Sequence, residues 1–145
     1  MALENLNLKV KKGATGLLGP NGAGKSTFLK TILGLIQATS GDGHVLGHDI
    51  RTEGPAIRSR IGYMPEYDAL NPEMEAIYQV KYSGELLGMN PTVAMSRAHE
   101  VLQYVGLGEQ RYRNIGGFST GMKQATKLAC SIIPVSYTHL RAHET

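Results

Sequence analysis

One segment of this 145-residue chain limits its fold more than any other. Residues 19–26 read Gly-Pro-Asn-Gly-Ala-Gly-Lys-Ser, the spacing G-x-x-x-x-G-K-S, and they lie between a short apolar run at 15–18 and a helical pattern that starts at Lys25. A loop of this composition between a strand and a helix is typical of phosphate-binding sites. The alternative is a tight glycine turn before a helix, which does not explain why Lys-Ser-Thr follows the last glycine.

The residue types in this loop suit a polyphosphate, which carries several negative charges and many acceptor oxygens. Such a site needs backbone amides that converge on one point, and glycine allows this because it lacks bulk and tolerates positive φ. We expect the Lys25 ammonium to face the β- and γ-phosphates and the Ser26 hydroxyl to join a Mg²⁺ shell. The predicted nucleotide-binding residues are Gly19, Pro20, Asn21, Gly22, Ala23, Gly24, Lys25, Ser26 and Thr27.

The rest of the pattern predicts an α/β chain. Alternating or apolar runs predict strands at 6–10, 15–18, 45–50 and 61–64, and apolar spacing predicts helices from Lys25, over 71–87, over 91–105 and over 122–133. Asn-Pro pairs at 71–72 and 90–91 have the form of helix starts. We therefore predict a phosphate-loop NTPase core over 1–133 with an inserted helical subdomain at 71–117.

Composition excludes several classes of protein. Hydrophobic residues make up 41% of the chain, too many for a disordered chain, yet no apolar stretch approaches the ~20 residues of a spanning helix. The one cysteine, Cys130, fits a packed residue in a reducing cytoplasm. The net charge of +3 comes without a basic patch interleaved with aromatic residues, so no nucleic-acid partner is expected.

Two further segments narrow the broad phosphate-loop class. Residues 62–66 read Gly-Tyr-Met-Pro-Glu, and residues 119–124 read Ser-Thr-Gly-Met-Lys-Gln. With the loop at 19–27, the sequence resembles the ATP-binding domain of ATP-binding cassette (ABC) transporters. The resemblance implies ATP and Mg²⁺ as ligands, ATP hydrolysis coupled to transport, a second ATP-binding subunit in a head-to-tail dimer, and a transmembrane permease. It also implies a cytoplasmic protein that is peripheral at the inner face of the membrane.

The resemblance also implies roles for single residues. Glu66 stands where the family most often has a Gln that ligates Mg²⁺, and its extra negative charge departs from that pattern; the alternative is a solvated loop acid. Ser119 and Gly121 match the family signature, a helix start that faces the γ-phosphate of the partner's nucleotide; the alternative for Ser119 is an ordinary helix cap. Lys25, Glu66 and Ser119 are thus the catalytic candidates, and Ser26 and Glu66 the metal ligands.

Other polar and aromatic residues carry weaker signals. We interpret two histidine pairs, His44 with His48 and His139 with His143, as surface residues rather than metal ligands. Arg58 and Arg60 could contact phosphate, but a solvated helix face fits them better. The tyrosines of the predicted helices are interpreted as packing residues: Tyr78, Tyr82 and Tyr104.

The same resemblance implies hydrolytic residues that we do not find. It calls for an apolar strand that ends in Asp, then a Glu and later a His, and none of these follows Ile133. We expect a core that is incomplete at the C-terminus, an unrelated tail at 134–145 that is an artefact of the sequence, and an exposed sheet edge that lowers solubility. Besides an ATPase subunit, a nucleotide-binding fragment without turnover and an ABC-type protein not linked to transport stay open.

Overall fold

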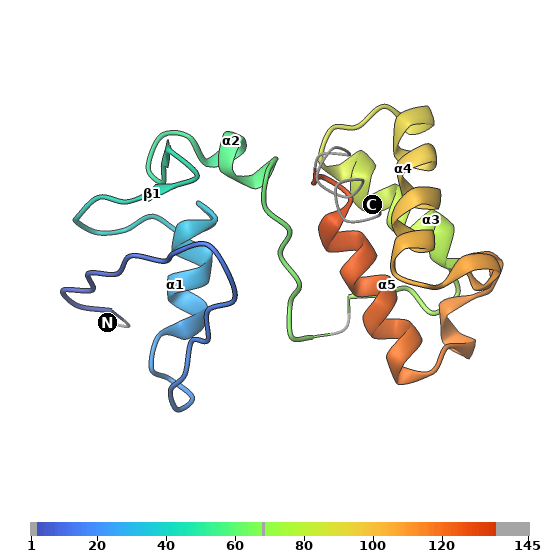
Figure 1. The fold of residues 1–145 in the computed structure, drawn as a ribbon, viewed down its shortest axis with the longest axis horizontal. Helices are drawn as coiled ribbons and strands as arrows, with labels where there is room; N and C mark the ends of the chain where they lie inside the picture. The colour runs from blue at the N-terminus through green and yellow to red at the C-terminus, as the bar shows by residue number, and fades with distance from the viewer. Residues whose placement is uncertain (1–2, 68, 136–145) are drawn as a thin grey trace. The chain divides into compact units, whose positions relative to one another are not determined.

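The computed structural model describes residues 3–67 and 69–135. Contacts within the chain divide it into two compact units, residues 1–58 and residues 59–145. The first unit contains the loop at 19–24, and the second contains most of the helices (Figure 1).

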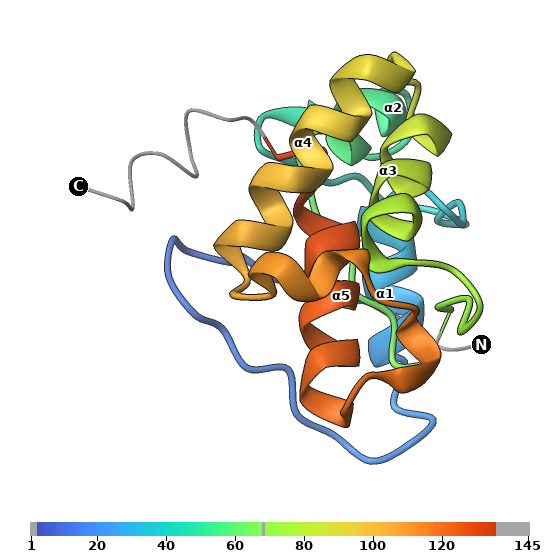
Figure 2. The same ribbon diagram turned by 90° about the vertical axis from the view of Figure 1, so that its right-hand side faces the viewer.

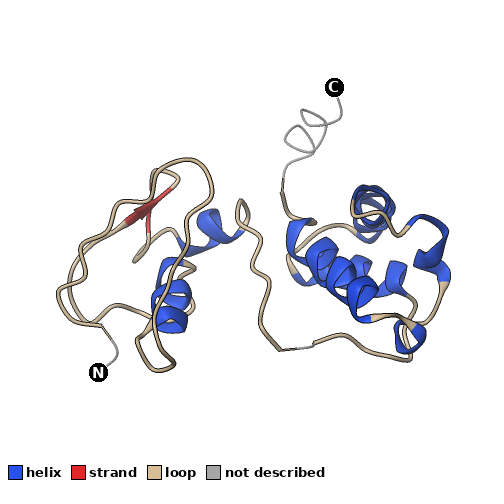
Figure 3. Cartoon of the chain, turned by 60° about the horizontal axis from the view of Figure 1, so that its bottom comes forward, coloured by secondary structure: helices blue, strands red, loops and turns tan. Residues whose placement is uncertain are grey.

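The first unit holds short elements only. Helix α1 spans Lys25–Ile32, strands β1 and β2 span His44–Val45 and His48–Asp49, and helix α2 spans Gly54–Arg58. The two strands form an antiparallel hairpin, drawn in red in Figure 3, in which His44 pairs with Asp49 and Val45 with His48.

The hairpin corrects the single strand that we predicted at 45–50. Leu46 and Gly47 both have positive φ, 52° and 82°, and they reverse the chain between β1 and β2. Positive φ at both central residues is the geometry of a type I′ turn, whose twist matches that of paired strands. A leucine in this conformation gives no local sequence signal, because glycine, Asn and Asp are the usual residues there.

The three other predicted strands, at 6–10, 15–18 and 61–64, are not found as strands. Within the described residues the only ladder joins β1 to β2, besides an isolated bridge between Glu75 and Asn114. The apolar side chains of the first two segments are exposed, and Leu18 is 94% exposed. A strand is stabilised by a neighbour and a covered face, and these segments have neither in the part of the chain that the structure describes.

The second unit is a helical assembly. Helix α3 spans Ala76–Leu86, α4 spans Pro91–Tyr104 and α5 spans Thr120–Ile132, and 3₁₀ turns η1 and η2 occupy Gly108–Tyr112 and Ile115–Gly117. Helix α3 packs on both α4 and α5 (Figure 2). The core that they share consists of Ala76, Ile77, Val80, Ala98, Val101, Leu102, Leu107, Ile115, Phe118, Ala129 and Ile133.

One of the two predicted helix starts is confirmed. The Asn90 side chain accepts a hydrogen bond from the Thr92 amide at 2.9 Å, and Pro91 is the first residue of α4. At the other Asn-Pro pair the prediction was wrong, because Asn71 accepts from the Glu73 amide in a local turn and α3 begins only at Ala76. The bond from the Ala76 amide to the Arg113 carbonyl ties that later start to the chain before η2.

Two predictions about side-chain packing have different outcomes. Cys130 packs against the core, as expected, and burial raises the pKa of its thiol. The tyrosines at 78, 82 and 104, which we interpreted as packing residues, are 49%, 50% and 45% exposed, so none of them belongs to the buried core. They lie on the outer faces of α3 and α4, whose inner faces are filled by smaller aliphatic residues.

None of the helices among the described residues has the length and apolar character that crossing a bilayer requires. The limits of the helical subdomain at 71–117 stay a prediction, since the second unit groups α3 and α4 with α5 rather than apart from it.

Candidate functional site

The loop before α1 has the backbone that an anion site needs. Gly24 is the N-cap of α1 with φ 94°, and Gly22 has φ 85°, both in the region that favours glycine. No side chain caps the helix, so the amides of its first turn have no side-chain acceptor. Unpaired amides and the positive end of the helix dipole favour a bound anion at this position.

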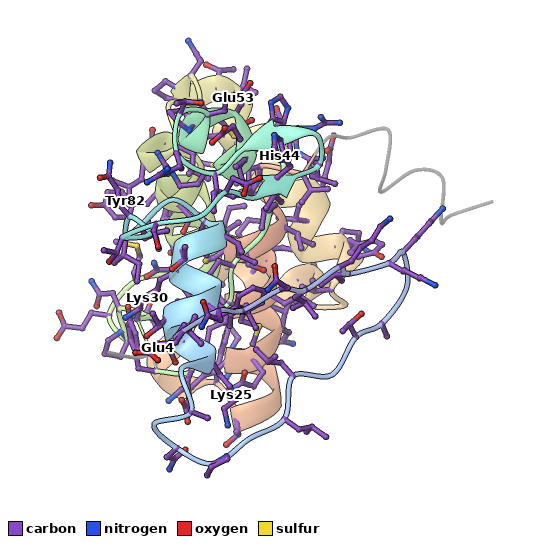
Figure 4. All side chains as sticks on the ribbon, turned by 90° about the vertical axis from the view of Figure 1, so that its left-hand side faces the viewer. Glu4, Lys25, Lys30, His44, Glu53 and Tyr82 are labelled. Atoms are coloured by element: carbon purple, nitrogen blue, oxygen red, sulfur yellow. The ribbon has the colours of Figure 1, made fainter. Side chains whose placement is uncertain are left out.

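The loop is closed on itself by short contacts. The Ala23 amide donates to the Pro20 carbonyl at 3.1 Å, and the Lys25 ammonium donates to the Gly19 carbonyl. A Cβ added at Gly19 would lie 3.2 Å from the Cβ of Ala23, so a larger residue would push the loop open. The lysine is therefore folded over the loop that it is expected to serve (Figure 4).

The charges around this loop are positive. Lys25 forms no ion pair with any of the carboxylates that the structure describes. Lys30 follows in the last turn of α1, and the first turn holds no acidic residue. Ser26 is exposed beside Lys25, and the Thr27 carbonyl accepts from the Thr31 hydroxyl at 2.7 Å. An anion at the loop thus meets the Lys25 ammonium and no competing acid among these residues.

The C-terminal end of α1 contacts Arg58, which we interpreted from the sequence as a phosphate contact or part of a solvated helix face. Gly34 has φ 71°, and the Arg58 guanidinium donates to the Leu33 carbonyl at 3.0 Å. A Cβ at Gly34 or at Gly54 would lie 2.9 Å or 2.8 Å from that guanidinium. Arg58 therefore satisfies a carbonyl at the C-terminus of α1 instead of lying on a solvated helix face, and a phosphate contact stays a prediction.

A second helix start lies at α5. Ser119 is its N-cap, and the Ser119 hydroxyl oxygen accepts from the Met122 amide at 3.2 Å. Ser119, Thr120 and Gly121 are exposed, whereas Phe118 just before them is buried in the core and anchors the helix start. The Ser119 O–H can still donate outward, so this end of α5 can receive an anion oxygen.

The segment that carries Glu66 lies along α5. The Lys127 ammonium donates to the Glu66 carbonyl at 3.4 Å, and the Glu66 residue itself is exposed. Gly62 faces the backbone of α5 so closely that an added Cβ would lie 2.9 Å from the Ser131 carbonyl carbon. The Glu66 carboxylate is thus presented to solvent from a segment that is held by its backbone.

The structure groups the predicted site residues by unit. Residues 19–27 belong to the first unit, and Glu66, Ser119 and Gly121 belong to the second. Sequence reasoning missed Lys127, which is 6% exposed. Its signal in the sequence was a charged residue on the apolar face of a predicted helix.

The histidine of β2 has a carboxylate partner rather than a metal-ligand set. His48 Nδ1 lies 3.1 Å from Glu53 Oε1, and the Asp49 amide donates to the other Glu53 oxygen at 2.7 Å. These bonds, the backbone one first, lower the pKa of Glu53. His44 is exposed on the paired strand. Among the described residues no group of three potential ligands could hold a metal ion, and His139 and His143 lie outside them.

Comparison with known proteins agrees with this geometry. A family model described as ABC transporter matches residues 3–137. The chain is 38% identical over 133 residues to the uncharacterized ABC transporter ATP-binding protein YxlF of Bacillus subtilis, covering 91% of this chain and 43% of that protein. It is 38% identical over 132 residues to the linearmycin resistance ATP-binding protein LnrL of the same species, covering 90% and 42%. The chain therefore spans less than half the length of these curated relatives.

Solved structures of ABC ATP-binding proteins are also similar to this chain. A dimeric ATP-binding cassette in a post-hydrolysis state, bound to ADP and Pi, matches with a TM-score of 0.73 and 26% identity over 92% of this chain and 62% of that chain. The ATP binding subunit of an ABC transporter matches with a TM-score of 0.61 and 26% identity, over 81% and 49%. The predicted fold class, a phosphate-loop NTPase core, is confirmed by these similarities.

Proposed function

The chain belongs to the ABC transporter family, and from this we propose that it binds Mg-ATP at residues 19–27 as part of a transporter's ATP-binding subunit. The observation that carries the proposal is the uncapped start of α1 behind a loop with two left-handed glycines and a lysine that pairs with no described carboxylate. That arrangement suits the polyphosphate of a nucleotide better than any neutral ligand.

Different groups of the loop would bind different parts of the nucleotide's polyphosphate. The amides of the loop and of the first turn of α1 would hold phosphate oxygens, and Gly22 and Gly24 allow the backbone to turn toward them. The Lys25 ammonium, now on the Gly19 carbonyl, would exchange that acceptor for a β- or γ-phosphate oxygen. Binding would therefore loosen the contact between Lys25 and the Gly19 carbonyl.

Mg²⁺ fits the donor set in chemical terms. The Ser26 hydroxyl and the Glu66 carboxylate are exposed oxygen donors, the ligand type that Mg²⁺ prefers. We propose Ser26 as a Mg²⁺ ligand beside the loop at 19–24. Glu66, which stands in place of the Gln that is usual in the family, is proposed separately as a Mg²⁺ ligand of the second unit. The bound ion would screen phosphate charge, and a carboxylate in its shell binds it more strongly than a neutral amide does.

A second ATP-binding subunit is the proposed partner at α5. The Ser119 hydroxyl and the exposed start of α5 form a second anion site, and one neighbour of known structure is a dimer bound to ADP and Pi. We propose that Ser119 and Gly121 receive the γ-phosphate held by the other subunit. A permease partner, and a position at the cytoplasmic face of a membrane through it, complete the proposal.

Export is the direction that the names of relatives favour. Besides the linearmycin resistance protein, the chain is 32% identical over 134 residues to Nod factor export ATP-binding protein I of Cupriavidus metallidurans, covering 92% of this chain and 44% of that protein. We propose that the parent protein hydrolyses ATP to drive transport.

Competition between ligands tests the proposal. A fluorescent ATP analogue is bound to the 145-residue chain and displaced with tripolyphosphate or with adenosine. The proposal predicts displacement by tripolyphosphate and little by adenosine, since the described site recognises phosphate. Displacement by adenosine alone would contradict it. ATPase turnover above that of a Lys25→Ala control would show that the chain is more than a binding fragment.

A further inference from the structure

Lys127 is a buried lysine that the proposed function does not use. It lies on α5 between two buried residues, Thr126 and Ala129, and is 6% exposed. A buried ammonium is costly unless hydrogen bonds compensate it, so a lysine at this position needs an acceptor. The acceptor is the main-chain carbonyl of Glu66, 61 residues earlier in the sequence.

Residues 62–66, the Glu66 segment, lie against α5 at the Lys127 bond and also at Gly62. The missing Cβ of Gly62 lets its backbone approach the carbonyl group of Ser131. Residues 127 and 131 are one helical turn apart on the same face of α5, and residues 62 and 66 are separated by the same four positions. The segment therefore runs antiparallel to α5, with a hydrogen bond at Glu66 and a close backbone approach at Gly62.

The attachment at Glu66 is made through the backbone. Lys127 contacts the carbonyl oxygen of Glu66 and leaves the exposed carboxylate to other partners. Lys127 thus donates from the helix to the backbone of residue 66. Loss of this bond would free the residue that we propose as a Mg²⁺ ligand while leaving its carboxylate intact.

We infer that Lys127 is a positioning residue, which ties the Glu66 segment to the helix that starts at Ser119. The inference rests on the proposed function for the role of Glu66 toward Mg²⁺. Because α5 carries Ser119 at its start and Lys127 two turns later, one rigid element sets the place of both groups. The part of the inference that concerns the hydrogen bond between Lys127 and the Glu66 carbonyl does not depend on nucleotide binding.

Three variants of the 145-residue chain test it. Lys127→Met keeps the length of the side chain and removes the donor, and Lys127→Arg restores a donor. Lys81→Met is the matched control, because it removes the same charge from α3, where Lys81 pairs with Glu85 at 3.1 Å. The first measurement is amide hydrogen exchange without nucleotide, and the second is the Mg²⁺ concentration that half-saturates binding of the fluorescent ATP analogue.

We expect Lys127→Met to raise the amide exchange rate at residues 63–67 by about tenfold, because one hydrogen bond from a charged donor is lost. The exchange rates of α3 and α4 should stay unchanged. The Mg²⁺ midpoint should rise several-fold, while Lys127→Arg and Lys81→Met stay near wild type. A uniform rise of the exchange rate over the helices, or an unchanged rate at 63–67, would overturn the positioning role of Lys127. An unchanged Mg²⁺ midpoint with raised exchange would overturn the link to the metal. Failure of the wild type to bind the analogue would overturn the proposed function and the link to Mg²⁺. The exchange rates would still show whether Lys127 holds residues 63–67.

Discussion

Replacement of Gly62 by alanine tests how closely the Glu66 segment packs on α5. A Cβ at this position would lie 2.9 Å from the Ser131 carbonyl carbon and closer still to its oxygen, and both atoms belong to the helix backbone. Because a helix backbone cannot rotate away as a side chain can, the segment itself must move outward. Overpacking of this kind costs roughly 1–3 kcal/mol, and we expect about 2 kcal/mol for Gly62→Ala.

Urea unfolding of the 145-residue chain, followed by circular dichroism at helix wavelengths, measures the loss. With a slope of about 1–2 kcal/mol per molar urea, the midpoint should fall by about 1–2 M. Gly117→Ala is the control, because a Cβ there meets only the end of the Arg113 side chain at 3.5 Å. If both variants unfold at the wild-type midpoint, the close approach of the segment to α5 is refuted.

Two other predictions concern the second unit. Asn90→Ala should destabilise it by about 1 kcal/mol, seen as a lower urea midpoint, because the bond to the Thr92 amide is lost; an unchanged midpoint would show that the cap contributes nothing. Burial raises the pKa of Cys130, so its thiol should react with iodoacetamide at pH 8 more slowly than in urea-unfolded chain. Since the unfolded thiol ionises first, stability should fall as pH rises past its unfolded pKa of ~8.5, and Cys130→Ser should remove that fall.

Features set by neighbouring residues could be predicted from the sequence. The loop at 19–24, the start of α1 at Lys25, and the caps Asn90 and Ser119 all depend on residues within one turn of each other. Glycine, Asn and Ser have strong local preferences at such positions, so their pattern indicates the structure directly.

Features set by distant partners could not be predicted. The apolar alternation at 6–10 predicts a strand, but a strand forms only beside another, and the described residues provide none there. Arg58 and Lys127 look like surface cations in the sequence, and each instead donates to a carbonyl 25 or 61 residues away. Their partners are set by packing, which the local pattern does not encode.

The nucleotide site depends most on Lys25, and its removal is the most direct test of the central claim. Isothermal titration of Mg-ATP into wild type and Lys25→Ala compares the two affinities, with Lys30→Ala as the control from the last turn of the same helix. Loss of a charged hydrogen bond to phosphate, about 1.5–3 kcal/mol, predicts weaker binding by about 10- to 100-fold for Lys25→Ala and little change for Lys30→Ala. Equal affinities for wild type and Lys25→Ala, or no binding by the wild type, would contradict a phosphate site at residues 19–27.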